Sequence, residues 1–322
     1  MSLDSGLRSS LVLPAICPPM FLVSGPDLVG EACRAGIVGA LPRANARTTE
    51  QFESWLAAIR SSLDEVENPG PLAVNFTAKI DPAELRDNLR ICAKYGVRVI
   101  ISATGNPRRL TEEVHDWGGL VFHDVTSVRF AEKAIDAGVD GVVCIGAGGG
   151  GHSGTVSHLA LIPKVREFYD GTIIAAGAIA TGAAVRAAEI LGADLAYLGT
   201  RFIATQESMA HRDYKSMLVD STSVDLRYVA AEGGVPANWL AASLARVGID
   251  VDALDAPASP GLPKDLRYWV DVWSAGQGID LIDDLPTVAE LTRRLRREYV
   301  AACELSDMSA AARLANDALE IG

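Results

Sequence analysis

Four segments of this chain repeat one pattern, in which an alanine-rich stretch with helical spacing ends at a glycine and a short apolar run follows at once. A helix that turns directly into a strand needs a left-handed backbone conformation after its last turn, and glycine adopts that conformation without strain. The segments are EACRAGIVGAL, ICAKYGVRVII, AEKAIDAGVDGVVCI and RAAEILGADLAYLG, with Gly36, Gly96, Gly138 and Gly192 at the joints. The pattern therefore predicts a chain that passes repeatedly from helix to strand.

Short apolar runs that do not alternate with polar residues are typical of strands buried on both faces. Eight such strands are predicted, near residues 14–20, 37–41, 71–76, 97–102, 119–122, 140–145, 172–176 and 195–199. Helices fit the gaps between them, and one helix begins with Asp81 as its cap and Pro82 in its first turn. This alternation predicts an α/β fold of the (β/α)8 TIM barrel type, with a doubly wound sheet as the second choice.

The alternation stops after Phe202. Residues 206–250 have a mostly helical pattern, and the proline-rich stretch DAPASPGLP at 255–263 reads as a linker. A strong helical pattern returns near the end of the chain. We therefore expect a barrel domain from residues 1–205 plus 271–322, and a smaller, mainly helical cap or substrate domain from residues 206–270.

Charge and cysteine content narrow the class of protein. The chain has 29 lysines and arginines against 41 aspartates and glutamates, a net charge of −12, with no basic cluster that nucleic acid would require. No run of about 18 apolar residues predicts a membrane span. The five cysteines lack paired spacing, which indicates a reducing compartment, and we expect a cytoplasmic protein.

The sequence VVCIGAGGGGHSG, residues 142–154, sets six glycines around a histidine at the end of the sixth predicted strand. Gly146, Gly148 and Gly151 match the G-x-G-x-x-G spacing of dinucleotide-binding folds, but there the motif closes the first strand and opens a helix at once. Here no helix can begin before Leu159 or so. The remaining explanations are a structural turn and a close approach of backbone to a bulky ligand, and the number of glycines favours the ligand.

In a barrel this glycine run lies at the mouth, where catalytic groups gather, so His152 is a candidate proton acceptor as well as a candidate structural residue. The seventh strand ends in AAGAIATG and the eighth in GTRF. Loops after these two strands often bind phosphate through backbone N–H groups, although they are also ordinary β-to-α turns. An anion site of this kind needs no basic patch.

Taken in order, these motifs resemble the nitronate monooxygenase family, formerly called 2-nitropropane dioxygenases, whose members are FMN-dependent (β/α)8 enzymes. The resemblance covers nearly the whole chain, and the order of the motifs makes it specific. Its carriers are PAICPPM (14–20), PLAVNF (71–76), GLVFHDVTS (119–127), the glycine run with GHSG, AAGAIATG (175–182), GADLAYLGTRFIATQE (192–207) and WSAGQGIDLIDD (273–284).

The resemblance implies a set of site residues. The backbone after the first strand lies against the flavin in that family, the asparagine of the third strand bonds the ring, and the last two barrel loops hold the phosphate. The expected cofactor-binding residues are Pro19, Met20, Phe21, Asn75, His123, Gly150, Gly177, Ala178, Gly199, Thr200 and Gln277. His152 is then the expected catalytic base, which takes the α-proton of a neutral nitroalkane. No metal is expected.

The implied reaction is oxidation of small alkyl nitronates by O2 to a carbonyl compound and nitrite. One position departs from the family pattern, because many relatives carry a lysine where Asp124 follows His123. That lysine lies near the flavin, so a carboxylate there removes a positive charge that would favour an anionic reduced flavin or an anionic substrate, although Asp124 could instead cap the next helix at Thr126 and Ser127.

Two alternatives stay open at this point. Related FMN barrels reduce quinones or enoyl thioesters with NAD(P)H, and a flavin-free barrel could serve as a scaffold. The sequence also leaves open the natural substrate, assembly as a homodimer, and whether the aromatic residues Tyr228, Trp239 and Trp273 line the pocket or the core.

Overall fold

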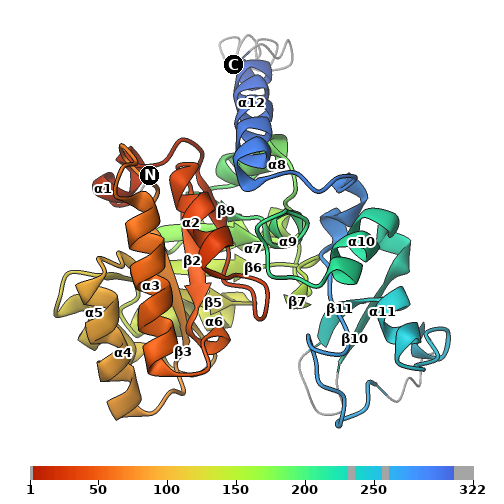
Figure 1. Cartoon of the computed structure of the whole chain (residues 1–322). Helices are drawn as coiled ribbons and strands as arrows, with labels where there is room; N and C mark the ends of the chain where they lie inside the picture. The colour runs from red at the N-terminus through yellow and green to blue at the C-terminus, as the bar shows by residue number, and fades with distance from the viewer. Residues whose placement is uncertain (1–2, 231–235, 256–260, 308–322) are drawn as a thin grey trace, which may run out of the picture.

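The computed structural model describes residues 3–230, 236–255 and 261–307 and contains a closed barrel of eight parallel strands (Figure 1). The ring closes where β1 pairs with β9, through Ile16 opposite Tyr197. Around the ring the strands are β1 Ala15–Cys17, β2 Val38–Pro42, β3 Leu72–Thr77, β4 Val99–Ala103, β5 Leu120–Val125, β6 Gly141–Ile145, β8 Thr172–Ala176 and β9 Leu195–Tyr197. The predicted (β/α)8 fold is confirmed, and each predicted strand has its counterpart.

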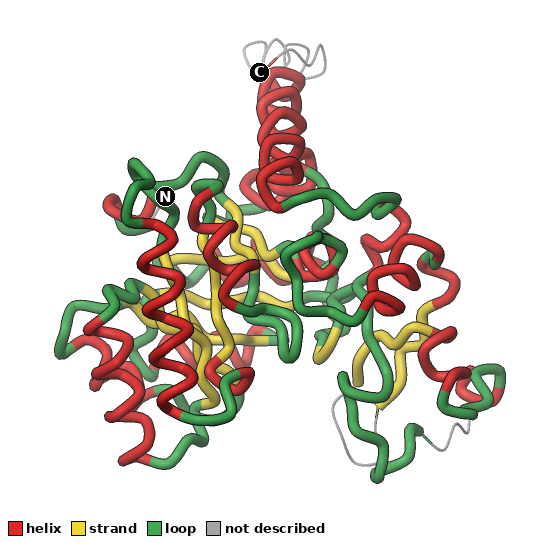
Figure 2. The backbone as a smooth tube through the Cα atoms, in the orientation of Figure 1, coloured by secondary structure: helices red, strands yellow, loops and turns green. Residues whose placement is uncertain are grey.

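Helices alternate with the strands and cover the outside of the barrel (Figure 2). The short helix α1 precedes β1, and α9 follows β9. The helices are α1 Ser5–Ser9, α2 Pro26–Arg34, α3 Thr49–Leu63, α4 Pro82–Lys94, α5 Arg108–His115, α6 Val128–Asp136, α7 His158–Arg166, α8 Gly182–Ile190 and α9 Gly199–Ile203. The side chain of Asp81 accepts the Ala83 N–H at 2.8 Å, as its predicted capping role requires. The four joint glycines have φ between 63° and 108°, the left-handed conformation that the sequence predicted.

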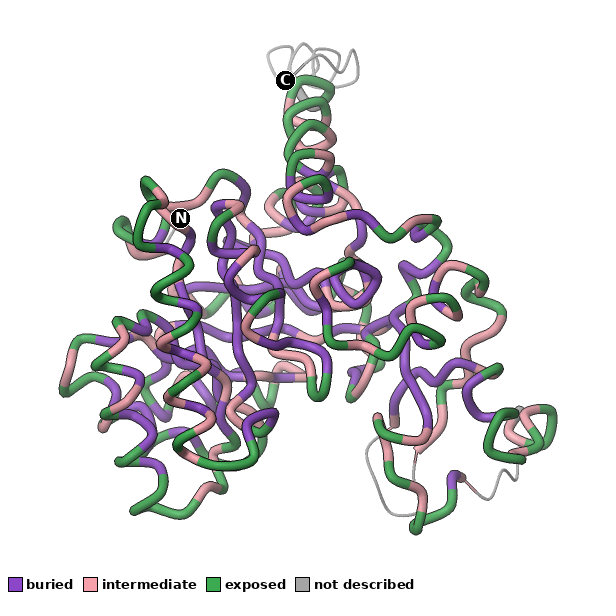
Figure 3. Tube along the Cα trace, in the orientation of Figure 1, coloured by how far each residue is buried: buried purple, intermediate pink, exposed green. Residues whose placement is uncertain are grey.

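The strands are buried along their length, while the helices expose their outer faces (Figure 3). Side chains alternate along each strand: Val99 and Ile101 belong to an apolar cluster inside the barrel, whereas Ile100 belongs to a second cluster between strands and helices. This alternation decides which residues can reach the mouth of the barrel.

The segment from residue 206 to residue 270 contains both helices and strands. Its elements are α10 Arg212–Asp220, the 3-10 turns η2 Ser223–Asp225 and η3 Ala253–Asp255, β10 Leu226–Ala230, β11 Pro236–Leu240 and α11 Ala241–Arg246. β10 and β11 are antiparallel, and β7 Gly151–His152 pairs with β11 as a third strand. The strands replace the helical pattern expected at these positions, since aromatic and branched side chains gain burial in the sheet. Residues 256–260 of the expected linker lie outside the described residues.

The expected last helix is α12 Val288–Asp307, which rises from the barrel beside α8 (Figure 1). A Cβ at Gly182 would lie 2.0 Å from the Leu295 carbonyl oxygen, so glycine permits the close approach of these two helices. None of the helices within the described ranges combines the length and apolar character that crossing a membrane requires.

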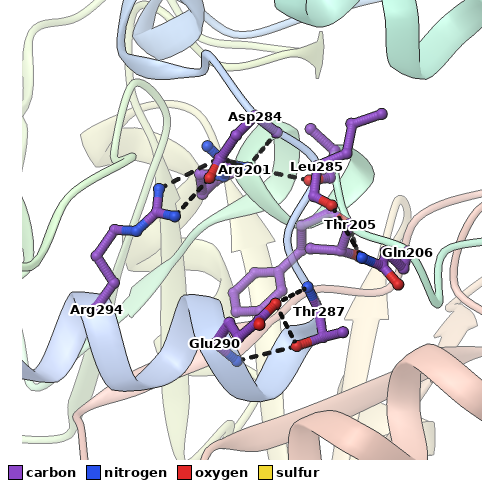
Figure 4. Close-up of polar contacts among 10 residues, drawn as sticks. Arg201, Thr205, Gln206, Asp284, Leu285, Thr287, Glu290 and Arg294 are labelled. Atoms are coloured by element: carbon purple, nitrogen blue, oxygen red, sulfur yellow. Dashed lines mark hydrogen bonds and ion pairs between the residues drawn. The ribbon is translucent and has the colours of Figure 1, made fainter.

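A polar cluster ties the segment before α12 to α9 (Figure 4). The guanidinium of Arg201 is almost fully buried, and its Nη2 lies 3.1 Å from Asp284 Oδ1 and 3.0 Å from the Ala204 carbonyl oxygen, to which it donates. The Asp284 carboxylate also accepts hydrogen bonds from both terminal nitrogens of Arg294 on α12. The cluster therefore fixes α9, whose first residues belong to the mouth of the barrel.

Candidate active site

A cavity of about 500 Å³ opens at the carboxyl ends of the barrel strands. We call it the mouth cavity. Its floor consists of the last inward-facing side chains of the strands, which are Asn75, Ala103, Asp124, Ile145, Ala176 and Tyr197. Each of these residues lies two positions beyond a residue of the inner barrel cluster, or belongs to it. A volume of this size and a mainly apolar wall are typical of sites for small ligands and cofactors.

The loop after β1 forms one side of the mouth cavity, where Pro19, Met20 and Phe21 line the wall. Asn45 holds this loop in place: its Oδ1 accepts the Leu22 N–H at 2.8 Å, and its Nδ2 donates to the Met20 carbonyl at 3.1 Å. The expected position of these loop residues beside a ligand agrees with this geometry.

The glycine run forms a second side of the cavity, and most of its glycines are required by contacts within the chain. A Cβ at Gly150 would lie 2.9 Å from the Gly276 nitrogen, and one at Gly146 would lie 2.6 Å from Nε2 of His158. Asn238 of β11 donates to the Gly149 carbonyl at 2.7 Å. The glycines thus let two other segments approach the loop closely, in addition to leaving room in the cavity.

The loops after β8 and β9 form the third side, with Gly177, Ala178, Gly199 and Thr200 in the wall. Gly177 has φ of 121° and Ala178 has φ of 56°, so the loop turns through two left-handed residues, and the alanine is strained there. The first N–H groups of α9 have no acceptor within the helix. These features fit the phosphate end of the flavin that the motifs imply.

His152 stands at the rim of the mouth cavity, where its backbone pairs with Ala237 of β11. Its ring meets the Trp269 ring edge to face, with centroids 5.1 Å apart. Trp269 Nε1 donates to Ser274 Oγ at 3.0 Å, and that oxygen also accepts the Gly151 N–H at 3.2 Å. The surrounding wall lowers the pKa of His152 by desolvation, so its imidazole is mostly neutral at pH 7 and can accept a proton.

Asp124 and Tyr197 are the unexpected part of the floor. Asp124 Oδ1 and Tyr197 Oη are both buried and have no hydrogen-bond partner among the residues that the structure describes. Asp124 does not cap the following helix, because Ser127 does so by accepting the Phe130 N–H. Burial raises the pKa of Asp124 to about 7. Two polar groups of this kind favour a polar ligand over an empty or purely apolar pocket.

The mouth cavity brings together His152 and all but two of the expected cofactor-binding residues. His123 lies elsewhere, because alternation along β5 turns it away from Asp124, and its Nδ1 lies 2.5 Å from Ser102 Oγ. Burial lowers the pKa of His123 to about 4. Gln277, at the start of η4 Gln277–Leu281, is exposed and donates its N–H to the Gly148 carbonyl at 2.9 Å.

Sequence reasoning missed Tyr197, Tyr214, Trp269 and Ser274, which also line the cavity. Trp239 and Trp273, which the sequence offered as pocket candidates, are buried in the core, and Tyr228 lies outside the wall. A tyrosine two residues before GTRF was the one available signal, since the inward face of a barrel strand ends there. Within the described ranges no cluster of histidine, cysteine or carboxylate side chains could hold a metal ion.

Comparisons with known proteins identify relatives of this chain. The family model described as nitronate monooxygenase matches residues 8–298. The chain is 33% identical over 195 residues to the 5-hydroxy-7a-methyl-1-oxo-octahydro-1H-indene-4-carboxyl-CoA dehydrogenase of Rhodococcus jostii, covering 61% of this chain and 53% of that relative. It therefore spans about half of that relative's length. It is 26% identical over 366 aligned positions to the nitronate monooxygenase of Paraburkholderia phytofirmans, covering 94% and 98% of the two chains.

Among solved structures, that of FabK from Thermotoga maritima has a TM-score of 0.76 at 24% identity, and the match covers 95% of this chain and 99% of that one. This likeness concerns the barrel and the arrangement of its helices.

Proposed function

The chain belongs to the nitronate monooxygenase family and is an oxidoreductase, and from this premise we propose that it oxidises alkyl nitronates with O2 to a carbonyl compound and nitrite. The observation that carries this proposal is the mouth cavity, to whose wall every one of the family motifs contributes at least one residue. FMN, bound in this cavity, would supply the electron transfer between the substrate and O2.

The protein's own residues would bind and orient both molecules. Gly177, Ala178, Gly199 and Thr200 would hold the phosphate, and Asn75 at the floor would meet the ring. The amide of Asn75 is oriented by its own hydrogen bond, in which Nδ2 donates to the Ile101 carbonyl at 3.1 Å. An amide fixed in this way would bind the ring in one orientation.

His152 would act as the base for neutral nitroalkanes. Its rim position opposite the floor suits a group that meets substrate rather than cofactor, and its lowered pKa keeps the imidazole ready to accept the α-proton. Preformed nitronates need no such step.

Residues 206–270 would form the cap over the substrate. Tyr214 and Trp269 from this segment line the mouth cavity, which supports its assignment as a substrate domain. The barrel of residues 1–205 plus 271–322 would then hold the cofactor, although residues 308–322 lie outside the described part of the chain.

The direct test is aerobic incubation of the FMN-loaded protein with propyl-2-nitronate, followed by a colorimetric assay for nitrite. We expect nitrite and acetone in equal amounts. Yellow, FMN-loaded protein that releases no nitrite would contradict the proposal. A preparation that stays colourless after incubation with FMN would show that the protein does not bind this cofactor.

A second candidate is an NAD(P)H-dependent FMN reductase of quinones or enoyl thioesters. The observation that favours it is the charge of the cavity. The floor carries the carboxyl group of Asp124, and the described residues of the wall include no lysine or arginine that could neutralise an anionic substrate. Anaerobic mixing with NADH and NADPH tests it, since the visible absorbance of the flavin must bleach. A flavin that stays oxidised with both nucleotides rejects this candidate.

A further inference from the structure

The floor of the mouth cavity carries a carboxyl group without a counter-charge. Asp124 lines the cavity, and its Oδ1 is buried with no partner in the described residues. Tyr197 Oη, three strands farther round the ring, is likewise buried and has no hydrogen-bond partner in the described residues, and the two groups interact electrostatically. A bound molecule must supply the missing partners, because a buried polar group left alone destabilises the protein.

The groups around Asp124 do not neutralise it. The strands, loops and α10 that border the cavity place His152, Tyr197 and Tyr214 in its wall as the other titratable side chains within the described residues. His123 faces the opposite side of β5 and is neutral at pH 7, since burial lowers its pKa to about 4. Tyr214 is engaged elsewhere, because its hydroxyl donates to the Ser274 carbonyl.

Burial alone raises the pKa of Asp124 to about 7, so the carboxyl takes either charge state near neutral pH. A second negative charge in the same cavity disfavours the carboxylate and favours the acid. The protonated acid carries no charge, so the floor no longer repels a negative charge on a ligand in the same cavity.

We propose that Asp124 determines the charge of the ligand that the mouth cavity accepts: an anionic substrate binds together with a proton on Asp124, and above neutral pH the cavity prefers uncharged ligands. This inference rests on the proposed function, and it narrows that function. Below neutral pH the cavity is expected to bind nitronates tightly, whereas above neutral pH it is expected to favour neutral nitroalkanes, quinones or thioesters.

Isobutyrate and isobutyramide test the proposal as an anionic and a neutral probe of nearly the same shape. The FMN-loaded full chain is titrated with each probe between pH 5.5 and pH 9, and the change in the visible flavin spectrum reports binding. The dissociation constant of isobutyrate is expected to rise about tenfold per pH unit above about pH 7, and that of isobutyramide to stay constant. Protonation of His152 affects only the acidic end, since its pKa is lowered.

In Asp124→Asn the rise is expected to vanish, so that isobutyrate binds about 100-fold more tightly than to the wild type at pH 9. Tyr197→Phe is the matched control, because it removes a polar group from the same floor without changing the charge: the pH dependence of isobutyrate binding is expected to persist. Calorimetry in two buffers is expected to show uptake of one proton per isobutyrate in the wild type at pH 8, and none in Asp124→Asn.

Equal pH dependence of isobutyrate binding in the wild type and Asp124→Asn overturns the proposal. So does binding of isobutyrate without proton uptake at pH 8, and so does a failure of isobutyrate to bind at pH 6. If Asp124→Asn does not fold, infrared spectroscopy of the wild type tests the proposal instead. The carbonyl stretch of a protonated carboxyl group must then persist up to about pH 7, and its loss at lower pH overturns the proposal. Failure of the proposed function has a different signature: nitrite is not released or flavin is absent, and calorimetry on flavin-free protein still measures the proton uptake.

Discussion

At the residue scale, the mouth cavity has two titratable groups at different depths: His152 at its rim and Asp124 at its floor. In the proposed function the rim imidazole would exchange protons with the substrate, whereas the floor carboxyl would respond to the charge of the bound ligand. Trp269, which contacts the His152 ring, has φ of 62°, a conformation that non-glycine residues rarely adopt, and strain of this kind is common at functional sites.

His152→Ala is expected to lower kcat/KM for 2-nitropropane by about 100-fold or more, because proton abstraction loses its base. The same variant should change kcat/KM for preformed propyl-2-nitronate much less. Steady-state oxygen consumption with both substrates measures the difference. Equal losses on the two substrates would show that His152 is not the base.

Asp124 also makes stability depend on pH. Its pKa is higher in the folded protein, about 7, than in the unfolded chain, so the folded state binds the extra proton and the free energy of unfolding falls as pH rises from about 4 to 7. Asp124→Asn removes this loss and is expected to be more stable than the wild type at pH 8, by on the order of 4 kcal/mol at most. Urea denaturation at pH 5 and pH 8 measures it; Asp170→Asn, at an exposed carboxylate, should show no such change.

The β8–α8 loop offers a paired test of backbone conformation. Gly177→Ala would place a Cβ 2.9 Å from the Gly149 nitrogen at φ of 121°, and we expect it to destabilise the protein by about 2 kcal/mol or more and to weaken FMN binding. Ala178→Gly relieves a strained alanine and should be neutral or stabilising by up to about 1 kcal/mol. Thermal melts and quenching of FMN fluorescence check both; the opposite ranking would contradict this account.

At the element scale, the glycine run depends on β11. Asn238 is almost fully buried, and Asn238→Ala leaves the Gly149 carbonyl without its donor. We expect a loss of about 1–3 kcal/mol in the free energy of unfolding and a larger relative loss of activity, since the loop that carries His152 loses one of the hydrogen bonds that position it. Activity that falls only in proportion to the folded fraction would argue against a positioning role.

The barrel elements could be predicted from the sequence because their signals are local. Gly36, Gly96, Gly138 and Gly192 mark helix ends through one backbone angle each, and parallel strands buried on both faces are uniformly apolar. The small sheet could not be predicted, because β7 is two residues long and pairs with a strand more than 80 residues away.

The site was predicted in the same uneven way. Residues whose backbone forms the wall, such as Gly177 and Gly199, follow from the motif order alone. His123 and Asp124 are adjacent in the sequence, and only the alternation along β5 decides which of the two reaches the cavity. The aromatic residues of the rim reach the cavity because the cap segment packs against the barrel, and no local sequence pattern predicts that packing.

At the scale of the whole molecule, the Arg201 cluster links α9 to a distant part of the chain, namely α12 and the segment directly before it (Figure 4). Asp284→Ala leaves the buried Arg201 guanidinium without its carboxylate, and we expect a loss of about 3 kcal/mol in the free energy of unfolding. Asp283→Ala, at the exposed neighbouring carboxylate, should cost less than about 1 kcal/mol. Chemical denaturation of both variants measures the contrast, and similar losses would show that the cluster adds little.

The pairing of β7 with β11 has a consequence for how the two parts of the molecule can move. His152 is contributed by the chain of the barrel, yet its backbone belongs to the sheet that β10 and β11 form in the cap segment. Any displacement of that sheet must carry the imidazole with it. The position of this candidate base is therefore set by the cap segment as much as by the barrel.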